Sequence, residues 1–128
     1  MIDLPDELRF SAEHEWVRVD NSSVARVGVT AYATSELGDI VYVSLPTVGS
    51  SVVAGDACGE LESTKSVSDI FAPVSGVVTS VNQAAMEEPE SIGDDPYGDG
   101  WLFDVEMSDS AELDALLDAD GYAELIEP

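Results

Sequence analysis

One lysine, Lys65, stands alone in this chain, within the stretch GELESTKSVSDIF at residues 59–71. Its neighbours Ser63, Thr64 and Ser66 are small and hydroxylated. A Schiff-base role would need a desolvated pocket that lowers the pKa of the amine, and a turn among carboxylates does the reverse. An enzyme that acylates a lysine must reach it from all sides, so a protruding turn with small neighbours favours a covalent attachment point. A solvated surface charge remains the alternative.

Charge sets the background for this lysine. The chain has 27 acidic residues against four basic ones, and its formal net charge is -23. Such a charge repels phosphate backbones and anionic lipid, so nucleic acid and membrane surfaces are not expected as partners. The acids are spread along the whole chain, which favours a halophilic host in which acids have replaced surface lysines. Against that background, the survival of Lys65 indicates selection for function.

Length and composition bound the fold. A chain of 128 residues with 45% hydrophobic residues can bury a core, and we expect a single domain over 1–128. No apolar run approaches the length of a transmembrane helix, and the N-terminus lacks the pattern of a signal peptide. Cys58 is the only cysteine, which excludes an intrachain disulfide. These features predict a cytoplasmic protein.

The elements that must present Lys65 are mostly strands. Alternating and β-branched runs bounded by Gly, Pro and Asp predict a mainly β fold. Strands are expected at 14–19, 23–29, 39–46, 76–82 and 101–107, with a turn at 20–22 and further short strands between 48 and 73. A short helix is expected at 30–38, capped by Thr30 and ended by Gly38. Residues 110–127 are expected to form one C-terminal helix capped by Ser110, with Leu113, Leu116 and Leu117 along one stripe.

Two segments echo each other on either side of the lysine. VSLPTVG at 43–49 and IFAPVSG at 70–76 each read as strand, then proline, then glycine. Two such halves can fold over each other as a small sandwich or barrel, with Lys65 on the hairpin that joins them.

The segment ESTKSVSDIFAPVSGVV at 62–78 resembles the lipoyl-attachment region of the glycine cleavage system H protein family. The resemblance extends over roughly residues 9–126 and includes HEWV (14–17), VGVTAYATSELGDIVYVSLPTVG (27–49) and DPYGDGWLFDV (95–105). Lysine hairpins alone are shared with biotinyl domains and with the shorter lipoyl domains of 2-oxo acid dehydrogenases. The lipoyl domains of 2-oxo acid dehydrogenases lack HEWV and DPYGDGW, and the biotin type typically has methionines beside the lysine, where this chain has Thr64 and Ser66.

This resemblance implies a barrel-sandwich hybrid fold of the lipoyl/biotinyl type, with short helices and a C-terminal helix. It also implies a non-catalytic carrier, with lipoate joined to Lys65 by an amide bond. The carrier would move the aminomethyl group of glycine from a pyridoxal-phosphate-dependent glycine decarboxylase (P protein) to a tetrahydrofolate-dependent aminomethyltransferase (T protein). Dihydrolipoamide dehydrogenase (L protein) and a lipoate-attaching enzyme complete the implied partners. The alternative is a relay that donates lipoate to other enzymes.

The resemblance also implies a cleft that shelters the loaded arm. Glu15 and Asp69 match family positions whose carboxylates could hold the protonated amine of the cargo, although each could be an ordinary solvated acid. Glu13 and Glu36 stand where relatives have neutral residues or histidine, and both would add negative charge near that cleft. His14 is expected to be structural.

No catalytic residue and no metal site is expected. Neither a nucleophile–base pair nor a cluster of metal ligands is visible in the sequence. The segment DDPYGDG (94–100) superficially resembles a calcium loop. It lacks the alternating oxygen ligands and the closing glutamate that such a loop requires.

Overall fold

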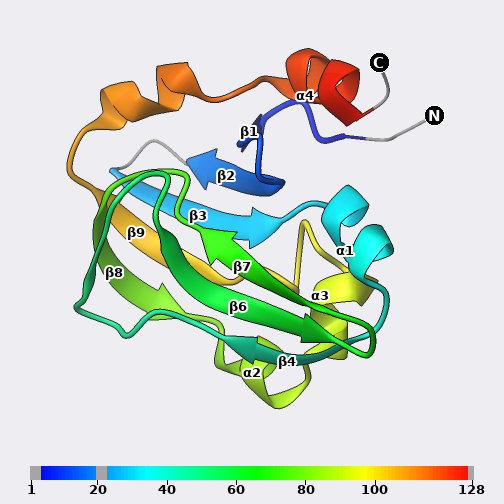
Figure 1. Cartoon of the computed structure of the whole chain (residues 1–128). Helices are drawn as coiled ribbons and strands as arrows, with labels where there is room; N and C mark the ends of the chain where they lie inside the picture. Colours follow the sequence, from blue (N-terminus) through cyan, green and yellow to red (C-terminus); the bar gives the residue numbers. More distant parts are fainter. Residues whose placement is uncertain (1–3, 20–22, 127–128) are drawn as a thin grey trace.

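The computed structural model describes residues 4–19 and 23–126, which form two antiparallel β-sheets with short helices at their edges (Figure 1). The larger sheet has six strands in the order β1-β2-β3-β9-β8-β5, and the smaller has three in the order β4-β6-β7. The strands are β1 (Arg9–Phe10), β2 (Glu15–Val19), β3 (Val24–Val29), β4 (Ile40–Ser44), β5 (Ser51–Val52), β6 (Ala57–Ser63), β7 (Val67–Phe71), β8 (Gly76–Val81) and β9 (Phe103–Met107). The helices are α1 (Ala31–Leu37), α2 (Gln83–Glu87), α3 (Glu90–Asp94), the 3₁₀ helix η1 (Ser110–Ala115) and α4 (Ala119–Ile126).

The main core lies between the two sheets. Alternate residues of each strand point inward, as the period of a strand requires. Val27 and Val105 of the large sheet are fully buried. Ile70 of β7, in the small sheet, belongs to the same buried cluster. The alternating patterns in the sequence predicted the strands, and the inward-pointing residues of these strands form this core.

A second hydrophobic cluster lies on the outer face of the large sheet. Trp16, Phe10 and Tyr122, the last of which belongs to helix α4, are all fully buried there. The Phe10 and Tyr122 rings stack with their centroids 4.8 Å apart, and the Trp16 indole donates a hydrogen bond to the Pro96 carbonyl (2.8 Å). The C-terminal helix is thus packed onto β1.

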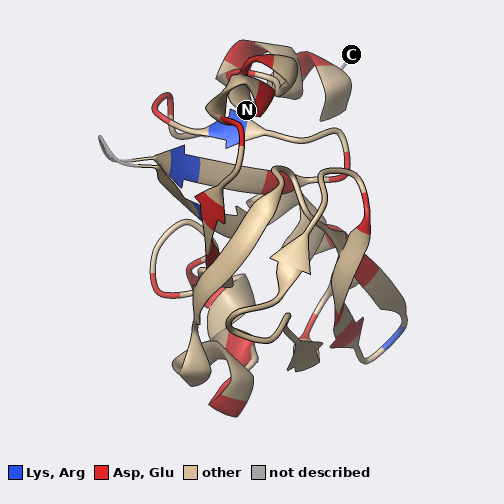
Figure 2. Ribbon diagram, turned by 90° about the vertical axis from the view of Figure 1, so that its left-hand side faces the viewer, with Lys and Arg blue, Asp and Glu red and all other residues tan. Residues whose placement is uncertain are grey.

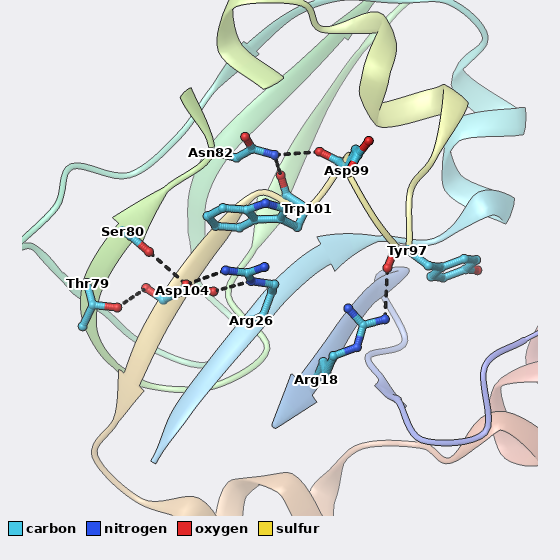
Figure 3. A network of polar contacts seen from close by, with 9 residues as sticks. All are labelled: Arg18, Arg26, Thr79, Ser80, Asn82, Tyr97, Asp99, Trp101 and Asp104. Atoms are coloured by element: carbon cyan, nitrogen blue, oxygen red, sulfur yellow. Dashed lines mark hydrogen bonds and ion pairs between the residues drawn. The ribbon is translucent and has the colours of Figure 1, made fainter. Parts of the chain in front are cut away.

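Polar and cation–π contacts fasten the 95–101 loop to the same outer face (Figure 3). Arg26 on β3 donates to both carboxylate oxygens of Asp104 on β9, at 3.0 and 3.2 Å, and its guanidinium lies 3.8 Å from the Trp101 ring centroid. Arg18 donates to the Tyr97 carbonyl at 3.0 Å. Planar guanidinium groups suit bidentate and stacked contacts that lysine cannot make, which gives a reason for arginine at these positions.

The two ends of α1 are where the sequence predicted them. The Thr30 hydroxyl accepts from the Ala33 amide at 3.2 Å, and Gly38 ends the helix with a φ of 85°. Both act as the expected signals for helix ends.

The single C-terminal helix expected at 110–127 was wrong, although a C-terminal helix is present. The chain forms η1, then an extended stretch, then α4, and the cap of η1 is Asp109 rather than Ser110. Leu117 exchanges two backbone hydrogen bonds with Phe10, both of 2.8 Å, so pairing with β1 interrupts the leucine stripe. Residue 127 lies outside the described residues.

The two echoing segments share one structural role. Residues 43–49 and 70–76 each carry the chain from the three-stranded sheet to the six-stranded sheet, across Pro46 and Pro73 respectively. Strand β1 and helices α2 and α3 were not predicted, and the expected turn at 20–22 lies outside the described residues. The Lys65 hairpin joins two strands of the smaller sheet.

A glycine makes the packing of Trp16 possible, and its substitution should be costly. A Cβ at Gly28 would collide with the Trp16 indole, which lies across the neighbouring strand. We expect Gly28→Ala to lower the free energy of unfolding by about 1–3 kcal/mol, because overpacking forces a buried ring from its place. Gly93→Ala in α3 is the control, since a Cβ there meets nothing within 4 Å. If urea unfolding gave the two variants the same free energy of unfolding, this packing would be contradicted.

Acidic side chains are distributed over strands, loops and helices on all parts of the fold seen in Figure 2. A net charge of -23 makes self-repulsion large, and salt screens it. The thermal midpoint should therefore rise between millimolar and molar potassium chloride. An unchanged midpoint would contradict the halophile interpretation.

Candidate functional site

Lys65 lies exposed in the tight connection between β6 and β7. These strands pair in register from Glu62 and Val67 downward, so the lysine lies at the tip of a regular hairpin. No hydrogen bond or ion pair joins its amine to another of the described residues. A modifying enzyme therefore meets a free amine on a rigid support.

The hydroxyl of Ser63 organises this tip. It accepts from the amides of Lys65 (3.2 Å) and Ser66 (3.1 Å) and donates to the Ser66 carbonyl (3.1 Å). The Thr64 amide donates to the carbonyl of Asp39, which follows α1. These bonds fix the lysine backbone while its side chain stays in solvent.

A cavity of about 280 Å³ lies beside the hairpin that carries the lysine. It is bounded by α1, the start of β7 and the turn before β2. A Cβ at Gly38 would lie 3.6 Å from the Lys65 Cε, so the lysine stem passes over the end of α1. The full lining is Glu13, His14, Tyr32, Ala33, Glu36, Leu37 and Ser68. A group attached to Lys65 would find this cavity next to its anchor.

Glu15 is buried, with an exposed fraction of 1%. Its carboxyl group accepts from the Ser11 hydroxyl at 2.6 Å and from the Phe71 amide on β7 at 3.2 Å. Burial raises the pKa of Glu15 from 4.5 to about 7, and the Ser11 and Phe71 bonds only partly oppose this. The residue is therefore not the solvated acid that the sequence left open.

Asp69 differs from Glu15 in its surroundings. Its side chain is exposed on β7, opposite Glu60 in the sheet register. Glu15 lines a second cavity, of about 310 Å³, together with Phe71 and the segment 115–117, and Asp69 lines neither cavity. Glu13 lines both cavities, and we call the two cavities together the groove.

The expected extra charges do reach the groove. Glu13 and Glu36 are exposed and both line the cavity beside Lys65, where His14 also lies. Desolvation lowers the pKa of His14, and the two glutamates oppose this shift. The contacts of Ser11 with Glu15 and of Tyr122 with His14 were not predicted from the sequence, because they depend on tertiary packing.

The arrangement offers one free amine, an adjoining groove and carboxyl groups along it. Among the described residues, no group of three or more His, Cys, Asp or Glu is placed to hold a metal ion. No helix in the described part of the chain is long and apolar enough to cross a membrane. These features suit a tethered group that lies along the protein surface.

The comparisons with known proteins agree with one another. The sequence profile described as "Glycine cleavage H-protein" matches residues 8–128. The chain is 53% identical over 126 residues to the glycine cleavage system H protein of Mycobacterium avium, covering 95% of this chain and 96% of that one. It is 51% identical over 125 residues to the probable glycine cleavage system H protein of Haloarcula marismortui, covering 98% of each.

A solved structure matches over almost the whole chain. It is the crystal structure of a glycine cleavage system H protein from Mycobacterium marinum, with a TM-score of 0.89 and 43% sequence identity. The alignment covers 98% of this chain and 100% of that one. The two sheets with short helices thus form the barrel-sandwich fold that the sequence predicted, and the chain belongs to the glycine cleavage H-protein family, whose members are lipoyl carriers and not catalysts.

Proposed function

We propose that this chain carries lipoate on Lys65 and moves the aminomethyl group of glycine between the enzymes of the glycine cleavage system. The observation that carries the proposal is the exposed amine at the tip of the β6–β7 hairpin, beside a cavity large enough to receive an attached chain. Membership of the H-protein family supports it. We treat residues 1–128 as one carrier domain, since both sheets share one core.

The residues present fit a lipoyl group. The lysine amine is free to form an amide, the Ser63 hydroxyl holds the turn, and Leu37 with Ala33 offers an apolar wall for an acyl chain. When bound, lipoate supplies a disulfide that opens to accept the one-carbon cargo and is later re-formed. A tethered carrier also raises the effective concentration of its cargo at each partner enzyme.

Glu15 and Asp69 are proposed to hold the cargo, which carries a protonated amine. Charge-assisted hydrogen bonds from an ammonium to a carboxylate are shorter and stronger than neutral ones. Burial favours the neutral form of Glu15, but an ammonium beside this carboxyl group, which Ser11 holds in place, would favour the ionised form and a strong contact. Asp69 is exposed and lines neither cavity, so its contribution would be a weaker, screened attraction from outside the groove.

The proposed partners are the P, T and L proteins and a lipoate-attaching enzyme, in the cytoplasm, where a dithiol can persist. The spread of 27 acidic residues and the likeness to a Haloarcula protein support a halophilic host. The alternative function, donation of lipoate to other enzymes, needs the same modified lysine. Genes for glycine decarboxylase and aminomethyltransferase beside this one would favour glycine cleavage, and a lipoyl-transfer enzyme without them would favour the relay.

Protein purified from its host should carry one lipoyl group, on Lys65 alone. Lys65→Arg should abolish the modification completely, because the guanidinium is not acylated in its place. Arg9→Lys is the control: it puts a second exposed lysine on β1, outside the hairpin, and should leave a single lipoyl group on Lys65. Intact mass and peptide mapping give the answer. A bare mass in cells with active lipoate metabolism would rule out the attachment.

Neutralising the acids of the groove should shorten the life of the cargo. Glu15→Gln and Asp69→Asn should leave lipoylation and folding nearly unchanged, since the Gln carbonyl can still accept from the Phe71 amide. Glu15→Gln should lose the aminomethyl group about tenfold faster, which corresponds to about 1.4 kcal/mol. Asp69→Asn should show a smaller increase, because that side chain is exposed.

The measurement is the release of formaldehyde or ammonia from the purified loaded protein, without the transferase. Glu87→Gln, an exposed acid at the end of α2, serves as the matched control for a lost charge. Cargo held equally long by all four proteins would show that the two acids do not hold it.

A further inference from the structure

His14 has an unusual backbone conformation. Its φ is 74°, and no other described residue apart from glycines has a positive φ. The turn is held from both sides, because the His14 amide donates to the Ser11 carbonyl at 3.1 Å and the Thr30 amide donates to the His14 carbonyl at 3.0 Å. Residues in this region cost free energy and gather at functional sites. The conformation aims the imidazole at a fixed place.

That place is the cavity beside Lys65. The imidazole lines it together with Glu13, Glu36 and Tyr32, and its centroid lies 5.0 Å from that of the Tyr32 ring. The opposite side of the imidazole faces the protein interior, where its Nδ1 lies 2.7 Å from the Tyr122 hydroxyl. One ring nitrogen is therefore bonded inside the fold.

The hydrogen-bond partners of the neighbouring hydroxyl groups determine which nitrogen of His14 carries the proton. The Thr30 hydroxyl accepts from the Ala33 amide and lies 2.7 Å from the Tyr122 hydroxyl, and both Thr30 and Tyr122 are fully buried. If Nδ1 carried the proton, Tyr122 would donate to Thr30, and the Thr30 proton would have no acceptor. If Nδ1 accepts, Thr30 donates to Tyr122 and Tyr122 donates to His14, so that every buried proton is used. The proton of neutral His14 therefore resides on Nε2.

We propose that Tyr122 fixes His14 as the Nε2–H tautomer and that His14 is a positioning residue, whose N–H donates to a sulfur of the arm lying in the cavity. This rests on the proposed attachment of lipoate to Lys65. His14 shares the lining of the cavity with Ser68 of the hairpin strand β7 and with Leu37, which precedes the Gly38 beside the lysine stem, so an arm anchored at Lys65 and lying in the cavity would come close to His14. The C-terminal helix thus shapes the groove through one hydroxyl.

The tautomer is read directly from ¹⁵N chemical shifts of the imidazole, in protein without lipoate and in lipoylated protein. We expect Nε2 protonated and Nδ1 unprotonated in both, with a shift change at Nε2 on lipoylation. Tyr122→Phe keeps the ring packed on Phe10 but removes the hydroxyl, and it should give a mixture of tautomers. A proton on Nδ1 in the unmodified protein, or shifts unchanged by lipoylation, would overturn the inference.

A pair of substitutions separates positioning from fold support. Asparagine tolerates a positive φ and places its amide near Nδ1, whereas glutamine places an N–H near the position of Nε2. His14→Asn should lose the aminomethyl cargo about three- to tenfold faster than the wild type, and His14→Gln should hold it nearly as long. If His14 only supports the fold, we expect the reverse order. His14→Asn would then lower the thermal midpoint less and lose cargo more slowly than His14→Gln, because asparagine tolerates the positive φ.

Failure of the proposed carrier function can be told apart from failure of the inference about His14. If intact mass shows no lipoyl group on host protein, the proposed function fails, and the arm contact fails with it. If Lys65 is lipoylated but His14→Asn holds its cargo as long as His14→Gln, the carrier function stands and the role of His14 is wrong.

Discussion

The hydrogen bond from the Phe71 amide to the buried carboxyl group of Glu15 links β7 of the smaller sheet directly to β2 of the larger sheet, beside the core that both sheets share. β7 is an edge strand of the smaller sheet, so its outward amides need partners. Glu15 supplies one from β2 of the larger sheet. Burial makes this carboxyl group hard to ionise, so the folded chain binds its proton more tightly than the unfolded chain does. Its contribution to stability is therefore present at low pH and is lost as the pH rises from 4.5 to about 7.

The same contact determines what Lys65 can do. Because β7 is hydrogen-bonded to β2, the β6–β7 hairpin is held against the larger sheet, and Lys65 at its tip is exposed to solvent. The turn of residues 11–14 then forms the opposite wall of the groove, and Glu13 lines both of its parts. The proposed carrier needs an anchor that several enzymes can reach and a place where the cargo waits. The exposed Lys65 and the groove would serve as these two.

Much of this could be predicted from local sequence, because the relevant signals were local. Alternation predicted the strands, Thr30 and Gly38 predicted the ends of α1, and the isolation of Lys65 indicated its importance. The C-terminal helix was predicted as too long because pairing of Leu117 with Phe10, residues distant in sequence, overrides the leucine pattern.

The site was harder to predict for the same reason. The sequence pointed to Glu15 only through family resemblance, and it could not show that the side chain is buried or bonded to Ser11 and Phe71. The Tyr122 hydroxyl reaches His14 across 108 positions of sequence, a contact that no spacing rule anticipates. Contacts of this kind arise only when the C-terminal helix packs onto the outer face of the large sheet.

The link between β7 and β2 depends on the protonation state of Glu15, which an NMR titration of its side-chain carboxyl carbon would measure, with the Phe71 amide followed in the same samples. We expect a midpoint near 7 for Glu15 and a change in the Phe71 amide shift with the same midpoint. A Glu15 that titrates near 4.5, with a Phe71 amide that does not respond, would contradict this link.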